Sequence, residues 1–336
     1  MKKVEIEKIR EDLDIYKINV PLPENPLKNL NAYVIKTPTK NLIIDTGFNR
    51  PESKEALFEG LRLLDINMDN TEIYVTHLHA DHIGLINEIM KDDTIIYMSQ
   101  RDYQYMYKGA TSNGWEISEN RLIKNGFPIA EIMLTRETNP ARIFGSSKVF
   151  PVKLVGDGDI INVGDFALKV IFVPGHTPGN TCLYLESEKI LFSGDHVLFD
   201  ITPNITAWND VLDPLGEYLD SLNKVKALDV KLVLPGHRKN DMDFYERVEQ
   251  LLKHHKVRLD ETLKILREDG PDNAYNIAAK MTWSMRGKKW EEFPVHQKWF
   301  AVGETLAHLD YLKIRGYIRE CVDNNDDIIK YQIVEQ

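Results

Sequence analysis

Three histidines and an aspartate lie close together in the stretch from 76 to 84, at His77, His79, Asp81 and His82. Histidines two residues apart cannot share one face of a helix, but they can converge at the end of a strand or in a tight loop. Such side chains would repel one another or lose solvation without a cation among them. Because a zinc site with an open position takes three protein ligands and a water, this cluster predicts two adjacent metal ions.

Three more ligand-type side chains follow apolar strands further along the chain, each next to a glycine: His176, Asp195 and His237. Taken singly, each histidine would more often be a turn residue than a ligand. Strand ends at one rim of a sheet are where α/β folds assemble sites from distant segments. Together with the first cluster, they predict one metal centre built from seven side chains.

Asp45 closes another short apolar strand, in the sequence Ile-Ile-Asp-Thr-Gly. An acidic residue in this position either caps a helix or forms a turn, or it accepts a hydrogen bond from a metal-binding histidine. The local sequence favours the cap. His196 follows Asp195, and we expect it to be structural.

The elements that must position these side chains alternate between strands and helices. Helical spacing of apolar residues predicts helices at 52–64, 83–90 and 215–228. Apolar or alternating runs predict strands at 15–20, 32–36, 41–44, 73–75, 95–98, 152–155, 166–173, 182–185, 190–193 and 231–234. This order is typical of an α/β fold.

The pattern loosens between residues 94 and 151, where helix fragments at 101–108 and 120–126 are separated by Gly, Asn and Pro. An irregular, aromatic-rich insertion after a ligand loop predicts a lid that shapes a substrate pocket. Tyr103 and Tyr107 are one helical turn apart, so they could equally form the packing face of a helix.

Length and composition limit the class of protein. The 336 residues, 43% of them apolar, are enough for a large domain of about 240 residues and a small one of about 80. The formal net charge of −10 argues against binding to nucleic acid or an anionic membrane by bulk charge. The two cysteines, Cys182 and Cys321, have no metal-site spacing and are typical of a reducing compartment. No apolar leader or membrane-length apolar run occurs, so we expect a soluble cytoplasmic protein.

The HxHxDH motif at 77–82, followed by Gly-His, Gly-Asp and Gly-His, resembles the metallo-β-lactamase superfamily over residues 10 to 245. The resemblance implies an αββα sandwich in residues 1–245, with a binuclear site at one edge of its two sheets. It also favours Asp45 as a partner of a metal ligand. One metal would be bound by His77, His79 and His176, the other by Asp81, His82 and His237, with Asp195 bridging them.

Two features narrow the chemistry that this resemblance implies. The members that hydrolyse antibiotics typically lack a bridging aspartate, several use a cysteine ligand, and they are exported. This chain has Asp195 and no cysteine in a ligand position, so we do not expect antibiotic hydrolysis. The complete second ligand set also argues against the mononuclear iron relatives that oxidise persulfides.

The predicted mechanism is hydrolysis by a hydroxide that bridges two divalent metal ions. Two cations about 3.5–4 Å apart can lower the pKa of a shared water toward neutrality and polarise a carbonyl or phosphoryl oxygen. Asp195 would set the metal spacing, and Asp81 would orient the hydroxide as well as bind metal. Zinc is the default for these nitrogen and oxygen donors, and iron or manganese also suit them.

The C-terminal segment, residues 246–336, is predicted to be helical and to end in a hairpin. Helices are expected at 242–268, 273–281 and 297–314, with strands at 317–322 and 328–334 around a turn at 323–327. Helices before a terminal hairpin resemble a winged helix and the β-lactamase-like protein 2 group, whose characterised relatives include an endoribonuclease acting on single strands. Residues 251–336 contain 14 Lys plus Arg and 14 Asp plus Glu. A module that grips phosphates should be basic, so packing, dimerisation or pocket closure is favoured.

The leading functional hypothesis is a binuclear hydrolase of a small ester, thioester or lactone. One alternative is a phosphodiesterase or endoribonuclease that uses the same metals on RNA, and another is a non-catalytic winged-helix binding module. The acidic charge disfavours RNA, and seven intact ligands argue against the module. Homodimer formation stays open. Four side chains could meet a substrate: Arg238, Tyr103, Tyr107 and Trp208.

Overall fold

The computed structural model describes residues 4–146, 148–285, 287–322 and 327–335. Its first sheet has seven strands that follow one another in sequence order. They are β1 (Ile6–Arg10), β2 (Leu13–Pro21), β3 (Asn29–Ile35), β4 (Asn41–Ile44), β5 (Thr71–Tyr74), β6 (Ile96–Ser99) and β7 (Lys153–Val155). The pairing is antiparallel from β1 to β4 and parallel from β4 to β7. The chain from β4 to β6 therefore leaves each strand at the same edge, where the first ligand cluster follows β5.

The second sheet has five strands in the order β12-β11-β10-β9-β8. They are β8 (Ile160–Val163), β9 (Phe166–Phe172), β10 (Thr181–Leu185), β11 (Ile190–Gly194) and β12 (Leu232–Pro235). The pairs are antiparallel, except that β11 and β12 are parallel because α8 (Pro214–Lys226) connects them. Sequence patterning predicted each of these strands except β8.

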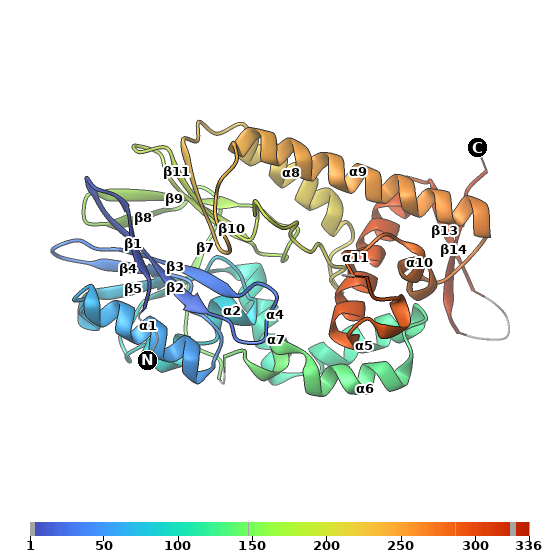
Figure 1. The fold of residues 1–336 in the computed structure, drawn as a ribbon, viewed down its shortest axis with the longest axis horizontal. Coiled ribbons are helices and arrows are strands. Elements are labelled where there is room, and N and C mark those ends of the chain that lie inside the picture. The colour runs from blue at the N-terminus through green and yellow to red at the C-terminus, as the bar shows by residue number, and fades with distance from the viewer. Residues whose placement is uncertain (1–3, 147, 286, 323–326, 336) are drawn as a thin grey trace.

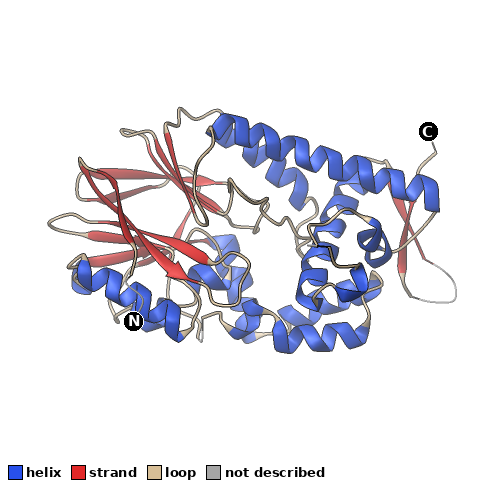
Figure 2. Ribbon diagram, viewed as in Figure 1, coloured by secondary structure: helices blue, strands red, loops and turns tan. Residues whose placement is uncertain are grey.

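The two sheets pack face to face and are covered by helices on their outer faces (Figure 1, Figure 2). Tyr33 of the first sheet meets Phe192 of the second edge to face, with ring centroids 5.5 Å apart, in a shared apolar core. A second core lies between the first sheet and the helices α1 (Pro51–Leu63), α2 (Ala80–Ile83) and α3 (Ile86–Ile89). A third lies between the second sheet and the helices α8 and α9 (Phe244–Asp269). The predicted αββα sandwich is confirmed.

The helix predicted at 83–90 is instead two short helices, α2 and α3. The His82 carbonyl accepts hydrogen bonds from both the backbone N–H and the hydroxyl of Thr46, at 2.9 and 2.8 Å. It is therefore taken by a neighbouring loop rather than by the next helical turn. This interruption ties the ligand-bearing turn to the loop that follows β4.

The insertion is largely helical, not irregular as the sequence suggested. It contains α4 (Gln100–Thr111), α5 (Gly114–Lys124), α6 (Ile129–Thr138) and α7 (Pro140–Ile143). These helices bury few apolar residues, so their periodicity in the sequence is weak. Ion pairs replace apolar packing in part, since Arg136 and Arg142 both bind the buried carboxylate of Glu119.

The C-terminal part packs on this insertion. Besides α9 it contains α10 (Ala274–Lys280), α11 (Val295–Ile314) and the antiparallel hairpin β13 (Ile318–Val322) and β14 (Ile329–Ile333). Short 3-10 turns occur at Met68–Asn70 and Trp290–Glu292. Leu122 and Phe127 of the insertion share an apolar core with α9, α10, α11 and the hairpin. The predicted helices and hairpin are confirmed. The turn at 323–326 lies outside the described residues. The winged-helix assignment stays a prediction, as does the domain boundary near residue 245, which α9 crosses.

Two further expectations concern the whole chain. Cys182 and Cys321 are both free thiols. Among the described residues, no helix is both long enough and apolar enough to span a bilayer.

Candidate metal centre

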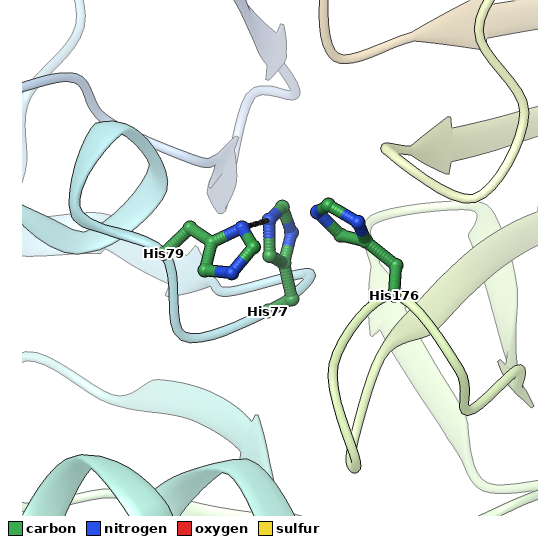
Figure 3. A group of neighbouring side chains, drawn as sticks. All are labelled: His77, His79 and His176. Atoms are coloured by element: carbon green, nitrogen blue, oxygen red, sulfur yellow. Dashed lines mark hydrogen bonds between the residues drawn. The ribbon is translucent and has the colours of Figure 1, made fainter. Parts of the chain in front are cut away.

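Three histidines from two loops converge at the edge of the sandwich (Figure 3). His77 and His79 follow β5, and His79 is the residue before α2, so the turn into the helix brings Nε2 of His77 within 3.1 Å of Nδ1 of His79. His176 enters from the loop between β9 and β10, with its ring centroid 4.9 Å from His77 and 4.5 Å from His79. One ligand atom from each lies within 4.8 Å of the other two. We call these residues the three-histidine group.

A second group combines a carboxylate with two histidines. Asp81 and His82 lie in α2, and His237 follows β12. The His237 Nε2 is 3.3 Å from an Asp81 oxygen, and the three side chains satisfy the same 4.8 Å limit. We call them the mixed group.

Asp195 lies between the two groups. It follows β11, the neighbour of β12 in the second sheet. Its carboxylate oxygens are 3.3 Å from His237 Nε2, 3.6 Å from His82 Nε2 and 3.8 Å from His176 Nε2. A single carboxylate therefore reaches histidines of both groups.

The inward-facing atoms of the site fit bound cations. The Nε2 atoms of His82, His176 and His237 and an oxygen of Asp195 are buried and have no hydrogen-bond partner among the described residues. Buried polar atoms without partners are costly, and a cation would satisfy all of them at once. Of the seven side chains only His79 is more than slightly exposed. The donor set suits divalent metal ions, as the sequence predicted.

Burial and the neighbouring carboxylates set the protonation of the ligand histidines. Burial lowers the pKa of His77 and His79, the latter to about 3, so both imidazoles are in the neutral form that binds metal. Burial opposes charge on His237 too, but Asp195 and Asp81 outweigh it and raise the pKa of His237 to about 10.

The outer nitrogens of His176 and His237 are each held by a backbone carbonyl. His176 Nδ1 lies 2.8 Å from the Asn204 carbonyl oxygen, and His237 Nδ1 lies 2.8 Å from that of Asn29. Such partners fix the ring orientation and leave Nε2 free to face the centre.

Asp45 holds His82 in the same way. Its Oδ2 is 2.7 Å from His82 Nδ1 and accepts a bond from the Thr76 hydroxyl at 2.7 Å, while its Oδ1 accepts a bond from the Thr76 N–H at 2.9 Å. The helix that follows begins after Arg50, so Asp45 caps no helix there. Its φ of 61° is a costly backbone conformation, which persists where the surroundings fix the residue. The local preference for a cap was wrong, and the role favoured by the family resemblance agrees with these contacts.

Asp102 is a buried residue that the sequence did not single out. One of its oxygens accepts bonds from the Leu78 N–H and the Thr177 hydroxyl at 2.9 and 2.7 Å, and the other accepts from the Gly179 N–H at 2.5 Å. It therefore joins the loop of His77 and His79 to the loop of His176. Burial raises the pKa of Asp102 to about 6. The only signal in the sequence is a Ser-x-x-Asp start to α4, which reads as an ordinary helix start.

The candidate substrate residues lie in different places. Trp208 stacks against His79, with centroids 6.4 Å apart and planes 22° from parallel, and Tyr105 packs on its other edge. Tyr103 packs against the core of the first sheet, whereas Tyr107 is 48% exposed. The Arg238 guanidinium donates to the Pro26 carbonyl. Of the four, Trp208 is the one with a described contact to a ligand histidine, and His196 packs against Tyr218 in the core, as expected of a structural residue.

Comparison with known proteins agrees with the fold. Residues 26–237 match the model of the metallo-beta-lactamase superfamily, and residues 259–334 match that of the metallo-beta-lactamase-like C-terminal domain. The chain belongs to the metallo-β-lactamase superfamily, and it is a metal-dependent hydrolase of that superfamily.

Several known proteins resemble the chain over most of its length. A beta-lactamase-like protein 2 homolog of Caenorhabditis elegans is 26% identical over 77% of this chain and 74% of its own length. The bovine acyl-coenzyme A thioesterase MBLAC2 is 27% identical over 62% of this chain and 72% of its own length. The crystal structure of the family protein TTHA1429 from Thermus thermophilus covers 96% of this chain and 99% of its own, with 26% identity and a TM-score of 0.78.

Proposed function

We propose that this protein hydrolyses a small thioester, and more broadly small esters and lactones, at a site for two divalent metal ions. The observation that carries the proposal is the place of Asp195, whose carboxylate reaches histidines of both groups. A thioester is favoured over other substrates because a relative is named an acyl-coenzyme A thioesterase. Zinc is the ion we expect first, since histidine nitrogens and carboxylate oxygens are its usual ligands.

The three-histidine group would hold one ion and the mixed group the other, with Asp195 between them. Two such ions supply an activated water near neutral pH and polarise the carbonyl that is attacked. The chain supplies the rest. Asp45, Asn29 and Asn204 orient the imidazoles, and Asp81 can accept a proton or orient water on the mixed-group side.

Trp208 is the side chain that we propose faces the acyl group. Its ring lies against His79, and its carbonyl accepts a hydrogen bond from Arg121 of α5 at 2.8 Å. The neighbouring Asn209 donates to Ser118 at 2.8 Å. The insertion therefore fixes an aromatic surface beside the site, which is suited to bind an apolar acyl chain and exclude water.

A panel of substrates tests the proposal. Zinc-loaded protein should hydrolyse an acyl-coenzyme A and S-acylglutathione. It should act weakly or not at all on bis-nitrophenyl phosphate and labelled single-stranded RNA. Removal of zinc by a chelator should abolish thioester hydrolysis, and His79→Ala should lower kcat/KM by more than about 100-fold. His254→Ala, outside the site, serves as the control.

The panel also tests the second candidate, a phosphodiesterase that uses the same site. The domain order favours it, because it resembles the β-lactamase-like protein 2 group, whose characterised relatives include an endoribonuclease. The neutral formal charge of residues 251–336 disfavours it. Cleavage of RNA with no thioester turnover, lost in His79→Ala, would replace the thioesterase proposal with this one.

A further inference from the structure

The loop between β11 and α8 lies on α11, the long helix of the C-terminal part. Its Asn204 side chain donates to the Glu304 carboxylate at 2.9 Å, and its Ala207 N–H donates to the Gly303 carbonyl at 3.0 Å. A Cβ added to Gly303 would stand 2.2 Å from the Thr206 hydroxyl oxygen, so the helix and the loop are in close contact. The loop therefore takes its position from a helix about 100 residues away in the sequence.

This loop also carries two groups that contact ligand histidines of the metal centre. The Asn204 carbonyl accepts the hydrogen bond from His176 Nδ1, and Trp208 stacks on His79. Asn204 thus contacts His176 through its backbone and Glu304 through its side chain. The path from α11 to a ligand imidazole contains only two hydrogen bonds.

Glu304 is an unusual residue to find at this contact. Its side chain is buried on α11, which packs between α9 and the insertion helix α6 (Figure 1). Its other described polar contact is with Arg258 of α9 at 3.9 Å, beyond hydrogen-bonding distance. Burial raises the pKa of Glu304 to about 7. A carboxyl group is costly in such a place, and a role in holding Asn204 would account for it.

We propose that Glu304 is a positioning residue of the hydrolase: through Asn204 it fixes the imidazole of His176, so the C-terminal part completes the three-histidine group. The inference rests on the proposed two-ion site but not on the identity of the substrate. Loss of a partner bonded directly to a ligand typically weakens metal binding about 10–100-fold, and displacement of such a partner, here the Asn204 carbonyl, should weaken it less. The three-histidine group should show this loss, and the mixed group, whose histidines are held by Asp45 and Asn29, should not.

Zinc titration of the metal-free full-length protein against a chromophoric chelator measures the two sites separately. Glu304→Met removes the carboxylate at similar side-chain length and leaves Asn204 the longer bond to the Phe300 carbonyl at 3.4 Å, whereas Glu304→Gln keeps an acceptor oxygen for Asn204. Asn204→Ala breaks the same bond from the loop side and keeps the backbone carbonyl. Lys298→Met is the matched control, because Lys298 is a buried charge on α11 that pairs with Glu131 of α6 at 2.7 Å and does not contact the loop.

The expected result is one site of unchanged affinity and one weakened several-fold, up to about 10-fold, in Glu304→Met and in Asn204→Ala, because both variants keep the Asn204 carbonyl but no longer hold it in place. Glu304→Gln and Lys298→Met should bind both ions as the unmodified protein does. The cobalt(II) absorption spectrum of Glu304→Met should change in the band that His176→Ala also removes. If Glu304→Met does not fold, Asn204→Ala decides the question.

Two ions bound with unchanged affinity in Asn204→Ala, or equal weakening in Lys298→Met, would overturn the inference. These outcomes are independent of the substrate assay. If the unmodified protein hydrolyses no thioester but Glu304→Met loses one zinc site, the proposed function fails and the positioning role stands.

Discussion

Removal of the Asp102 carboxylate should loosen the metal centre, because this carboxylate joins two of the loops that carry ligands. In Asp102→Ala three donors lose their acceptor. The Leu78 N–H and the Thr177 hydroxyl lose the oxygen that they share, and the Gly179 N–H loses the other carboxylate oxygen. Each unsatisfied buried donor costs about 1–3 kcal/mol. A water that enters the vacated space would relieve part of this, so we expect a total loss of about 3–5 kcal/mol.

The stability of Asp102→Asn should lie between that of the unmodified protein and that of Asp102→Ala. The amide keeps one acceptor oxygen and turns its NH2 group toward a backbone N–H, so one donor is left without a partner. The expected loss is about 1–2 kcal/mol. Because the carboxylate joins the loop of His77 and His79 to that of His176, zinc affinity of the three-histidine group should fall in the same order.

Urea unfolding of metal-free protein and zinc titration together measure both effects. Tyr97→Phe is the control. Tyr97 lies on β6, the strand that precedes α4, and its hydroxyl donates a buried hydrogen bond of 2.9 Å to Glu72, which belongs to neither ligand loop. The substitution should cost about 1 kcal/mol and leave zinc binding unchanged. Wild-type zinc affinity in Asp102→Ala, or a stability loss no larger than in Tyr97→Phe, would refute the reasoning.

Three shorter predictions follow from other contacts. The folded-state pKa of Glu304, raised from 4.5 to about 7, means that wild-type protein loses about 3 kcal/mol of stability as pH rises through this window. Glu304→Gln should not show this loss in unfolding experiments from pH 4 to 9, and parallel pH curves would contradict the assignment. Gly175→Ala should cost more than about 3 kcal/mol in urea unfolding, since φ is +135° and the new Cβ would stand 2.3 Å from Tyr218 Cβ. The control Gly158→Ala, at φ +85° with open space, should cost about 1 kcal/mol, and equal losses would argue against the clash. Trp208→Leu should raise KM for a thioester several-fold with unchanged zinc content; an unchanged KM would remove Trp208 from the substrate surface.

The seven side chains of the centre could be predicted from the sequence because metal chemistry selects their types and places them at strand ends. His77, His79, Asp81 and His82 are neighbours in the chain, and each of the remaining three follows an apolar run beside a glycine. The alternation of strands and helices likewise predicted the sandwich, since apolar periodicity is a local property.

Apart from Asp45, the groups that hold these ligands were decided only by the tertiary structure. Asp102 bonds to Leu78, Thr177 and Gly179 across separations of 24, 75 and 77 residues, and Asn204 bonds to Glu304 across 100. No periodicity links positions so far apart, and a buried carboxylate in a helix looks in sequence like an exposed one. The packing of the insertion on the C-terminal helices was hidden for the same reason, because the apolar residues that join them are few and belong to separate segments.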